Sequence, residues 1–119
     1  MGAEWIEYKG KRILYIKYGG LKPQEMLDLI YTATQMIVEA KSKGIEIFSL
    51  TDLTGCHTNQ EFVDLSKKQG MISLPLTKKA AVVGITGLKK ILFRAVNSVA
   101  PNPRVPFDTV EEALEWLVK

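Results

Sequence analysis

The chain has 119 residues, with 16 basic and 13 acidic side chains that leave a formal net charge of +3. Its 46% hydrophobic and 24% charged residues are typical of a globular domain, which excludes a disordered chain, and its length fits a single domain over residues 1–119. No apolar run reaches the roughly 20 residues that cross a bilayer, the N-terminal residues lack the apolar stretch of a signal peptide, and the chain has one cysteine, so we expect a cytoplasmic protein.

The first elements along the chain are a predicted β-hairpin and a long helix. Aromatic and β-branched residues fill two runs, 5–8 and 12–18, that flank a turn at Gly10. Pro23 suits a first helical turn because its missing N–H would have no partner there, and apolar residues then recur at helical spacing up to Gly44. These features predict an antiparallel hairpin followed by an amphipathic helix.

A strand, a helix and a second strand come next. Residues 45–50 alternate apolar with mixed side chains and predict a strand. A capping box at 58–61, in which the Thr58 hydroxyl would accept a hydrogen bond from a helical N–H, predicts a helix that ends near Gly70. The continuous apolar run 80–85 predicts a strand that is covered on both faces.

The last part of the chain predicts two more helices around a short strand. Apolar residues fall on one side of a helix over 88–99, and prolines end it. Residues 104–107 predict a short edge strand, and a second capping box at 109–112 begins the last helix. Strands that alternate with helices predict one α/β domain, whose N-terminal antiparallel hairpin leads into a mainly parallel sheet flanked by four helices.

Two predicted loops lie at the carboxyl ends of strands, where ligands collect in open α/β sheets. The first, residues 52–58, holds a carboxylate, a thiol, the only imidazole and two hydroxyls. Cys56 beside His57 could act as a nucleophile and its base, but adjacent side chains usually point apart, so we favour a buried cysteine and a loop histidine. One cysteine and one histidine are too few for a closed zinc site. We therefore predict no catalytic residue, no metal and no cofactor.

The second loop, residues 84–90, combines two glycines with two lysines in the first turn of the next predicted helix. The glycines permit close approach of a backbone or a ligand, and Thr86 or Gly87 can cap the helix. Lys89 and Lys90 beside free helical N–H groups would attract an anion or an acidic partner. The competing interpretation is that these residues serve only in capping and packing.

Basic residues gather in the middle of the chain. Between Phe62 and Arg104 there are eight lysines and arginines and one acidic residue. A nucleic-acid site would combine such charge with interleaved aromatic residues, and this stretch has only Phe62 and Phe93. We therefore expect no nucleic-acid partner, which leaves either solvated ends of helices and strands or a patch for an anionic partner.

Four segments spread along the chain carry a family resemblance: residues 5–15, 50–55, 80–90, and 107–109 with 112–117. Together they resemble the bacterial and archaeal SpoIIAA-like family of STAS/Sec14-type single-domain proteins. The resemblance covers essentially the whole chain and includes no catalytic signature. It implies a strand–helix superhelix with a mixed sheet, in agreement with the predicted order of elements.

The resemblance implies two kinds of binding protein. Anti-sigma-factor antagonists of the STAS type are protein-interaction modules switched by phosphorylation at a helix start, and the matching loop here offers Thr54 and Thr58 as phosphoacceptors. The Sec14 side implies instead a small carrier for an apolar or lipid-like ligand. We favour a non-enzymatic regulatory module with a protein partner and keep the carrier as the alternative.

The expected working surface lies at the carboxyl ends of the strands, where a protein or a small apolar or anionic ligand would bind. Its candidate residues are Asp52, Thr54, Thr58, Thr86, Gly87, Lys89 and Lys90. A homodimer is a further expectation, because an exposed Trp5 or Tyr18 on the edge hairpin could support one.

Overall fold

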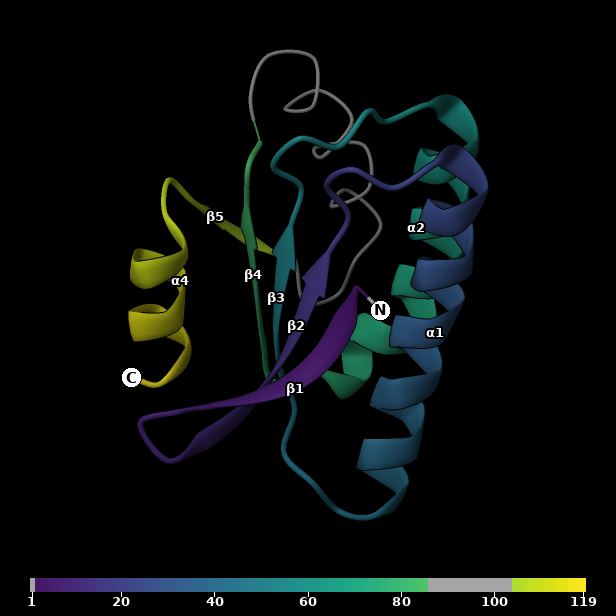
Figure 1. Ribbon diagram of the computed structural model, residues 1–119. Coiled ribbons are helices and arrows are strands. Elements are labelled where there is room, and N and C mark those ends of the chain that lie inside the picture. The colour runs from purple at the N-terminus through teal and green to yellow at the C-terminus, as the bar shows by residue number, and fades with distance from the viewer. Residues whose placement is uncertain (1, 86–103) are drawn as a thin grey trace.

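The computed structural model describes residues 2–85 and 104–119, which form a mixed sheet with helices on both faces (Figure 1). The sheet has five strands in the order β1-β2-β3-β4-β5. These strands are β1 (Ala3–Tyr8), β2 (Lys11–Lys17), β3 (Phe48–Asp52), β4 (Lys79–Val83) and β5 (Val105–Phe107). The helices are α1 (Pro23–Ser42), α2 (Gln60–Ser73) and α4 (Val110–Leu117), with a short 3₁₀ turn, η1 (Leu74–Leu76).

Among the described strands, only β1 and β2 pair antiparallel, and β2 to β5 pair in parallel. The hairpin turns at Lys9 and Gly10, whose positive φ angles of 48° and 83° are typical of a two-residue type I′ turn. The predicted hairpin and the mainly parallel sheet are therefore confirmed. Trp5 on β1 is half-buried beside the Arg12 guanidinium, which lies 5.0 Å from the centre of its ring, and the homodimer stays a prediction.

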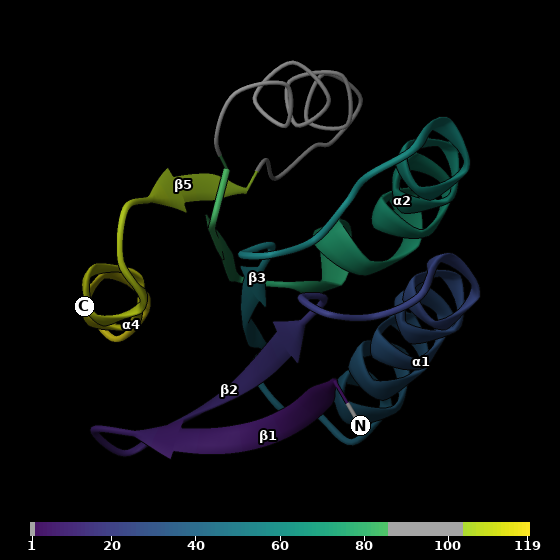
Figure 2. The same cartoon turned by 45° about the horizontal axis from the view of Figure 1, so that its top comes forward.

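The helices form two layers. α1 and α2 lie side by side over one face of the sheet, and α4 lies against the other face (Figures 1 and 2). Four flanking helices were expected. Residues 2–85 and 104–119 contain three α-helices, and the helix expected over 88–99 lies outside the described residues.

Alternating side chains of the central strands fill an apolar cluster on each face of the sheet. On β2, Leu14 and Ile16 belong to the cluster under α1 and α2, whereas Ile13 belongs to the cluster under α4. On β4, Val82 joins the first cluster and Ala81 the second. Successive side chains of a strand point to opposite faces, so a strand that is apolar throughout is buried on both sides. The prediction that the apolar run at 80–85 contains a strand covered on both faces is confirmed by β4, which ends at Val83.

The strand predicted over 45–50 begins later, at Phe48. Gly44, with a φ of 75°, ends α1, and the N–H of Ile45 donates to the carbonyl of Ala40 over 3.1 Å. This hydrogen bond is part of a C-terminal cap, which holds the residues after Gly44 close to the helix. The predicted end of the helix at Gly44 is confirmed, and the following residues form a connection rather than a strand.

Thr58 does not cap α2, contrary to the prediction. Asn59 is the N-cap residue, and its side-chain oxygen accepts a hydrogen bond from the N–H of Phe62 over 2.8 Å. Asparagine is among the strongest N-cap residues, and here it begins the helix one position later than expected. The second predicted cap is confirmed, since the Thr109 hydroxyl accepts from the N–H of Glu112 over 3.1 Å.

The helix α2 continues past Gly70, where we had expected it to end, and stops at Ser73. Gly70 is buried, and a Cβ there would come within 3.6 Å of the Leu74 side chain, an ordinary contact. Packing of the helix against the rest of the protein outweighs the weak helix propensity of one glycine. Sequence propensity alone placed this boundary too early.

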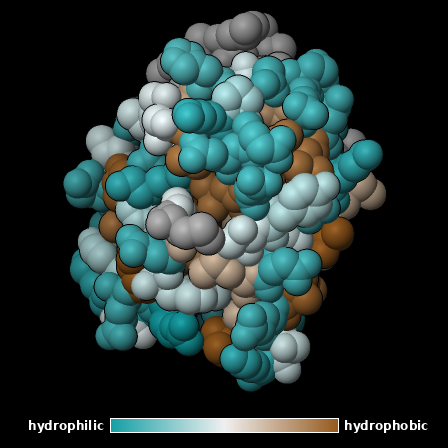
Figure 3. Space-filling view, turned by 45° about the vertical axis from the view of Figure 1, so that its right-hand side comes forward, coloured by the Kyte–Doolittle hydropathy of each residue, from teal (hydrophilic) through white to brown (hydrophobic). Residues whose placement is uncertain are grey.

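The outer faces of α1 and α2 are largely polar. Hydrophilic side chains cover most of the face in view in Figure 3, with apolar ones between them. The large apolar side chains exposed on these two helices are Tyr31, Val38, Met71 and Ile72. In residues 2–85 and 104–119, no helix is both long enough and apolar enough to cross a membrane.

Candidate functional site

Three loops meet at the carboxyl ends of β2, β3 and β4. The backbone of Thr54, in the loop after β3, lies against a glycine from each of the other two loops. A Cβ on Gly19 would lie 2.2 Å from the Thr54 carbonyl oxygen, and a Cβ on Gly84 would lie 2.3 Å from the Thr54 nitrogen. The φ of Gly84, 83°, is also one that side chains other than glycine rarely adopt. Only glycine at these two positions lets the loops pack so closely.

Asp52 ends β3 and connects this loop to the sheet. One of its carboxylate oxygens accepts a hydrogen bond from the N–H of Thr54 over 3.0 Å, and the other accepts from the Tyr15 hydroxyl over 3.1 Å. Burial, together with the smaller effect of the hydrogen bond to Asp52, raises the pKa of Tyr15 to about 12. Both oxygens of Asp52 thus have partners inside the protein, which gives this candidate residue a structural role.

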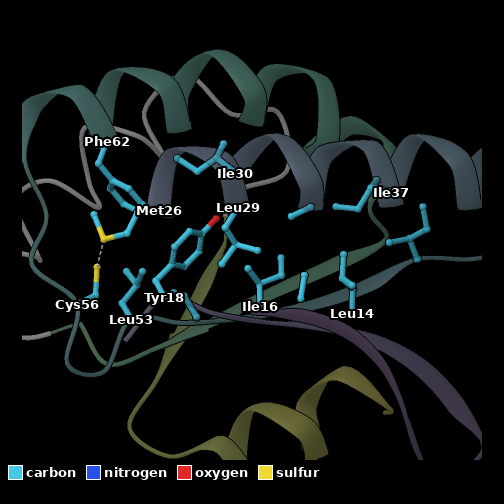
Figure 4. Close-up of a cluster of buried hydrophobic side chains, with 14 of the residues drawn as sticks. Leu14, Ile16, Tyr18, Met26, Leu29, Ile30, Ile37, Leu53, Cys56 and Phe62 are labelled. Atoms are coloured by element: carbon cyan, nitrogen blue, oxygen red, sulfur yellow. Dashed lines mark hydrogen bonds between the residues drawn. The ribbon is translucent and has the colours of Figure 1, made fainter. Parts of the chain in front are cut away.

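The other candidates in this loop have different surroundings. Thr54 and His57 are exposed, Cys56 is 3% exposed, and Thr58 is half-buried at the edge of a cavity. The Cys56 sulfur lies 3.6 Å from the sulfur of Met26, within the apolar cluster under α1 and α2 (Figure 4). A nucleophile–base pair needs both side chains at one accessible place, and here the thiol is buried and the imidazole is exposed. Of the two candidate phosphoacceptors, Thr54 is the more accessible.

The second predicted loop falls largely outside the described residues. Thr86, Gly87, Lys89 and Lys90 all lie within 86–103. The anion site expected there stays a prediction. In the described part of the chain, no three His, Cys, Asp or Glu side chains gather closely enough to hold a metal ion.

A cavity of about 80 Å³ lies between the sheet and the helices α1 and α2. Its floor includes Ile16 and Val82 of the sheet, and its walls include Ile30 and Ile37 of α1. Figure 4 shows Ile16 on the sheet below the helices and Ile37 on the side of α1 that faces the sheet. Thr58 is the only one of the candidate site residues in the described chain that lines this cavity.

Tyr18 lines the cavity, and the prediction that it is exposed on the hairpin is wrong. The residue is 5% exposed, and its ring meets the ring of Phe62 edge-on, with the centroids 5.2 Å apart. Figure 4 shows its hydroxyl directed toward the helices. Burial raises the pKa of Tyr18, so the phenol is protonated at neutral pH. The alternation of Leu14 and Ile16 on β2 could have revealed this, because Tyr18 falls on the same face.

Arg104 is a second lining residue that sequence reasoning missed. It is half-buried and directly precedes β5, and it is the only charged side chain among the described residues that line the cavity. Burial lowers the pKa of Arg104, and the nearby Tyr18 acts in the opposite direction. In the sequence, Arg104 is one of many basic residues between Phe62 and Arg104, and nothing in that pattern indicates that it lies beside a cavity.

No protein-family model matches the chain, and no curated protein matches it. A solved structure does: an uncharacterised protein of the DUF3478 family with a SpoIIAA-like fold, from Shewanella loihica PV-4. The two share 21% sequence identity and a TM-score of 0.67, over 97% of this chain and 91% of the other. The chain therefore has a SpoIIAA-like fold, as its sequence resemblance implied.

Proposed function

We propose that this protein is a non-enzymatic binding module that acts through the loops at the carboxyl ends of β2, β3 and β4, with another protein as its partner. The close packing of Thr54 against Gly19 and Gly84 carries this proposal. It holds the three loops in one arrangement before a partner arrives. A surface that is already ordered loses less conformational entropy on binding than a mobile one, which favours affinity.

The same surface carries the proposed point of regulation. Thr54 is exposed at the centre of the interlocked loops, and its N–H is already bonded to Asp52. A phosphate on Thr54 would add between about −1.5 and −2 units of charge to this surface at neutral pH. That change in charge would alter which partner proteins the loops bind. The loop that carries Thr54 would stay folded, because its hydrogen bond to Asp52 uses the backbone N–H and not the hydroxyl.

Site-specific photocrosslinking in the cells that make the protein tests the proposed surface. A photoreactive amino acid at position 54 should give a covalent adduct with one partner protein. The matched control is the same amino acid at Lys41, which is exposed in the last turn of α1, at the opposite end of the strands. Adducts of the same protein with equal yield at both positions, or at Lys41 alone, would contradict the proposal.

A second candidate function, a carrier for a small molecule, is favoured by the cavity between the sheet and the helices. Its volume of about 80 Å³ is well below the roughly 300–1,000 Å³ of sites for drug-sized ligands. A lipid chain needs more space than this, so the proposed cargo is a small molecule with an apolar body. The cavity adjoins Thr58, so its contents can influence the loop that the first proposal assigns to the partner.

A further inference from the structure

The strand β1 forms one edge of the sheet, as Figure 2 shows, and backbone groups on its outer side have no hydrogen-bond partner among residues 2–85 and 104–119. The N–H of Lys17 donates to the carbonyl of Gly2 over 2.6 Å, and these two residues continue the β1–β2 register. In an antiparallel pair, every second residue bonds to the neighbouring strand and the residues between them bond to the other side. The N–H and carbonyl groups of Ala3, Trp5 and Glu7 therefore point outward.

The two edges of the sheet differ in how well they can accept another strand. At the far edge, β5 has three residues, and the middle one, Pro106, has no N–H to donate. At the near edge, β1 has six residues with neither proline nor lysine among them. Proteins commonly protect an unpaired edge by a short strand, by proline or by charge. On β1 only the charges of Glu4 and Glu7 serve this purpose, so a strand that keeps these carboxylates apart can pair there.

These charges select a register in which two copies of β1 pair antiparallel. Outward-bonding residues must face each other, and the longest overlaps are then centred on Glu4, Trp5 or Ile6. The first register sets two Glu4 carboxylates directly opposite each other, which is destabilising. The register centred on Ile6 sets Trp5 opposite the charge of Glu7. The register centred on Trp5 sets Glu4 opposite Ile6 and Glu7 opposite Ala3, so no two charges are opposed.

Trp5 is suited to the centre of such a pairing. It is half-buried against the apolar cluster under α1 and α2, and the Arg12 guanidinium lies 5.0 Å from the centre of its ring. Two such rings opposite each other form an aromatic cross-strand pair, which is among the stabilising ones. Because the edge at β5 is protected by Pro106, the pairing closes as a two-fold dimer and does not continue into a fibre.

We infer that two copies of this chain associate through β1, antiparallel and centred on Trp5, so that their sheets join into one continuous sheet. This interface gives the homodimer predicted from the sequence a defined place in the fold. It goes beyond both proposed functions, because neither the loop that carries Thr54 nor the cavity takes part in it.

Sedimentation velocity of the full chain over a series of concentrations tests the inference. Two paired strand edges bury less than about 1,200 Å², the low end for specific interfaces, so we expect a dissociation constant of about 1–100 µM. The sedimentation coefficient should rise with concentration from the monomer value to the dimer value. A monomer at every concentration up to about 1 mM would overturn the inference.

A proline on β1 tests whether backbone pairing holds the dimer together. Glu7→Pro removes an outward N–H and leaves the hydrogen bonds between β1 and β2 in place, since this N–H points away from β2. It should raise the dissociation constant at least about tenfold, because the bond is lost twice in the dimer. The matched control, Glu7→Ala, keeps the N–H and should leave the dimer in place. An equal loss in both variants, or in neither, would overturn the strand pairing.

A charge at the centre of the interface provides a second test that does not depend on the folding of Glu7→Pro. Trp5→Lys sets two ammonium groups opposite each other and should abolish the dimer. The matched control is Val105→Lys, which adds the same charge at the exposed outer edge of β5 and should leave the dimer intact. Circular dichroism checks that each variant is folded. A dimer that persists in folded Trp5→Lys would contradict the interface.

Cysteines test the register. In the register centred on Trp5, the two copies of this residue lie about 5.5 Å apart between Cα atoms, within the range of a disulfide, so Trp5→Cys should oxidise to a covalent dimer. The two copies of residue 7 lie about 14 Å apart, so Glu7→Cys should stay monomeric under the same conditions. Cys56 is 3% exposed and does not compete. A covalent dimer of Glu7→Cys but not of Trp5→Cys would overturn the register.

Discussion

Tyr15 and Tyr18 lie close together in the sequence but belong to opposite faces of the sheet. Tyr15 packs against the apolar cluster under α4 and donates to Asp52, whereas Tyr18 lies in the cluster under α1 and α2 and faces the cavity. Burial raises the pKa of both phenols. The two residues differ in their hydrogen bonds, since of the two only Tyr15 donates to a carboxylate. The face of the sheet that a tyrosine occupies therefore determines which residues it contacts.

The raised pKa of Tyr15 predicts how stability depends on alkaline pH. Its pKa rises from an ordinary 10.0 to about 12 on folding, so the folded state favours the protonated phenol. This contribution to the free energy of unfolding is complete below about pH 10 and is lost as the pH rises through about 12. Ultraviolet titration of the protein should show a tyrosine ionisation step near pH 12, and this step should be absent in Tyr15→Phe.

Asp52→Asn should move that step to lower pH without returning it to the ordinary value. The variant removes the negative partner, but burial, the larger cause, remains. The matched control is Asp64→Asn, at an exposed carboxylate on α2 that accepts from Gln60 instead of a tyrosine. An unchanged step in Asp52→Asn would show that the hydrogen bond to Tyr15 does not form in solution.

The start of α2 shows how a helix end depends on one residue. Thr58 and Asn59 are both good capping residues by type, and a glutamate follows Thr58 at the capping-box spacing. In the structure, Asn59 accepts from the N–H of Phe62, and the side chain of Thr58 lines the cavity instead. Two adjacent residues that both suit a cap therefore take different places, Asn59 at the helix end and Thr58 beside the cavity.

Alanine substitutions at these two positions should differ in their effect on stability. Asn59→Ala should lower the free energy of unfolding by about 1 kcal/mol, because the N–H of Phe62 loses its acceptor. Thr58→Ala should lower it by less than about 0.5 kcal/mol, since no cap is lost. Urea denaturation measures both values. A larger loss in Thr58→Ala than in Asn59→Ala would reverse the assignment of the N-cap.

At the scale of the whole fold, as residues 2–85 and 104–119 describe it, one sheet carries two apolar clusters. Ile30 of α1 is 5% exposed in the first cluster, and Leu117 of α4 is 0% exposed in the second. The strands β2, β3 and β4 contribute side chains to both faces, so neither cluster can form without the sheet. We therefore expect the two layers to unfold together.

Truncation in either cluster should destabilise the whole protein. Ile30→Ala and Leu117→Ala should each lower the free energy of unfolding by about 2–5 kcal/mol, through lost contacts and the space left behind. Val38→Ala, at a position 38% exposed on α1, is the control and should cost less than about 1 kcal/mol. Urea denaturation followed by circular dichroism and by tryptophan fluorescence should show one shared transition in each variant. Separate transitions for the two probes would contradict a single cooperative unit.

Local patterns in the sequence were sufficient for the hairpin at Gly10, the long helix that ends at Gly44, the doubly buried strand β4, the Thr109 cap and the order of the elements within residues 2–85 and 104–119. Each depends on periodicity or on hydrogen bonds between residues a few positions apart, and such interactions can be read from neighbours in the chain. The SpoIIAA-like fold was implied by the family resemblance of four sequence segments, and the solved structure that matches the chain confirms it.

The site depended on tertiary structure. The loop at 52–58 was correctly placed at the carboxyl end of a strand, but the sheet turns Asp52 toward Tyr15 and brings Thr58 to the cavity. The cavity joins Tyr18, Ser49 and Arg104, which are far apart in sequence, and its shape exists only once α1 and α2 pack on the sheet. Periodicity specifies which face a side chain occupies, whereas packing decides which distant residues meet there and whether space remains between them.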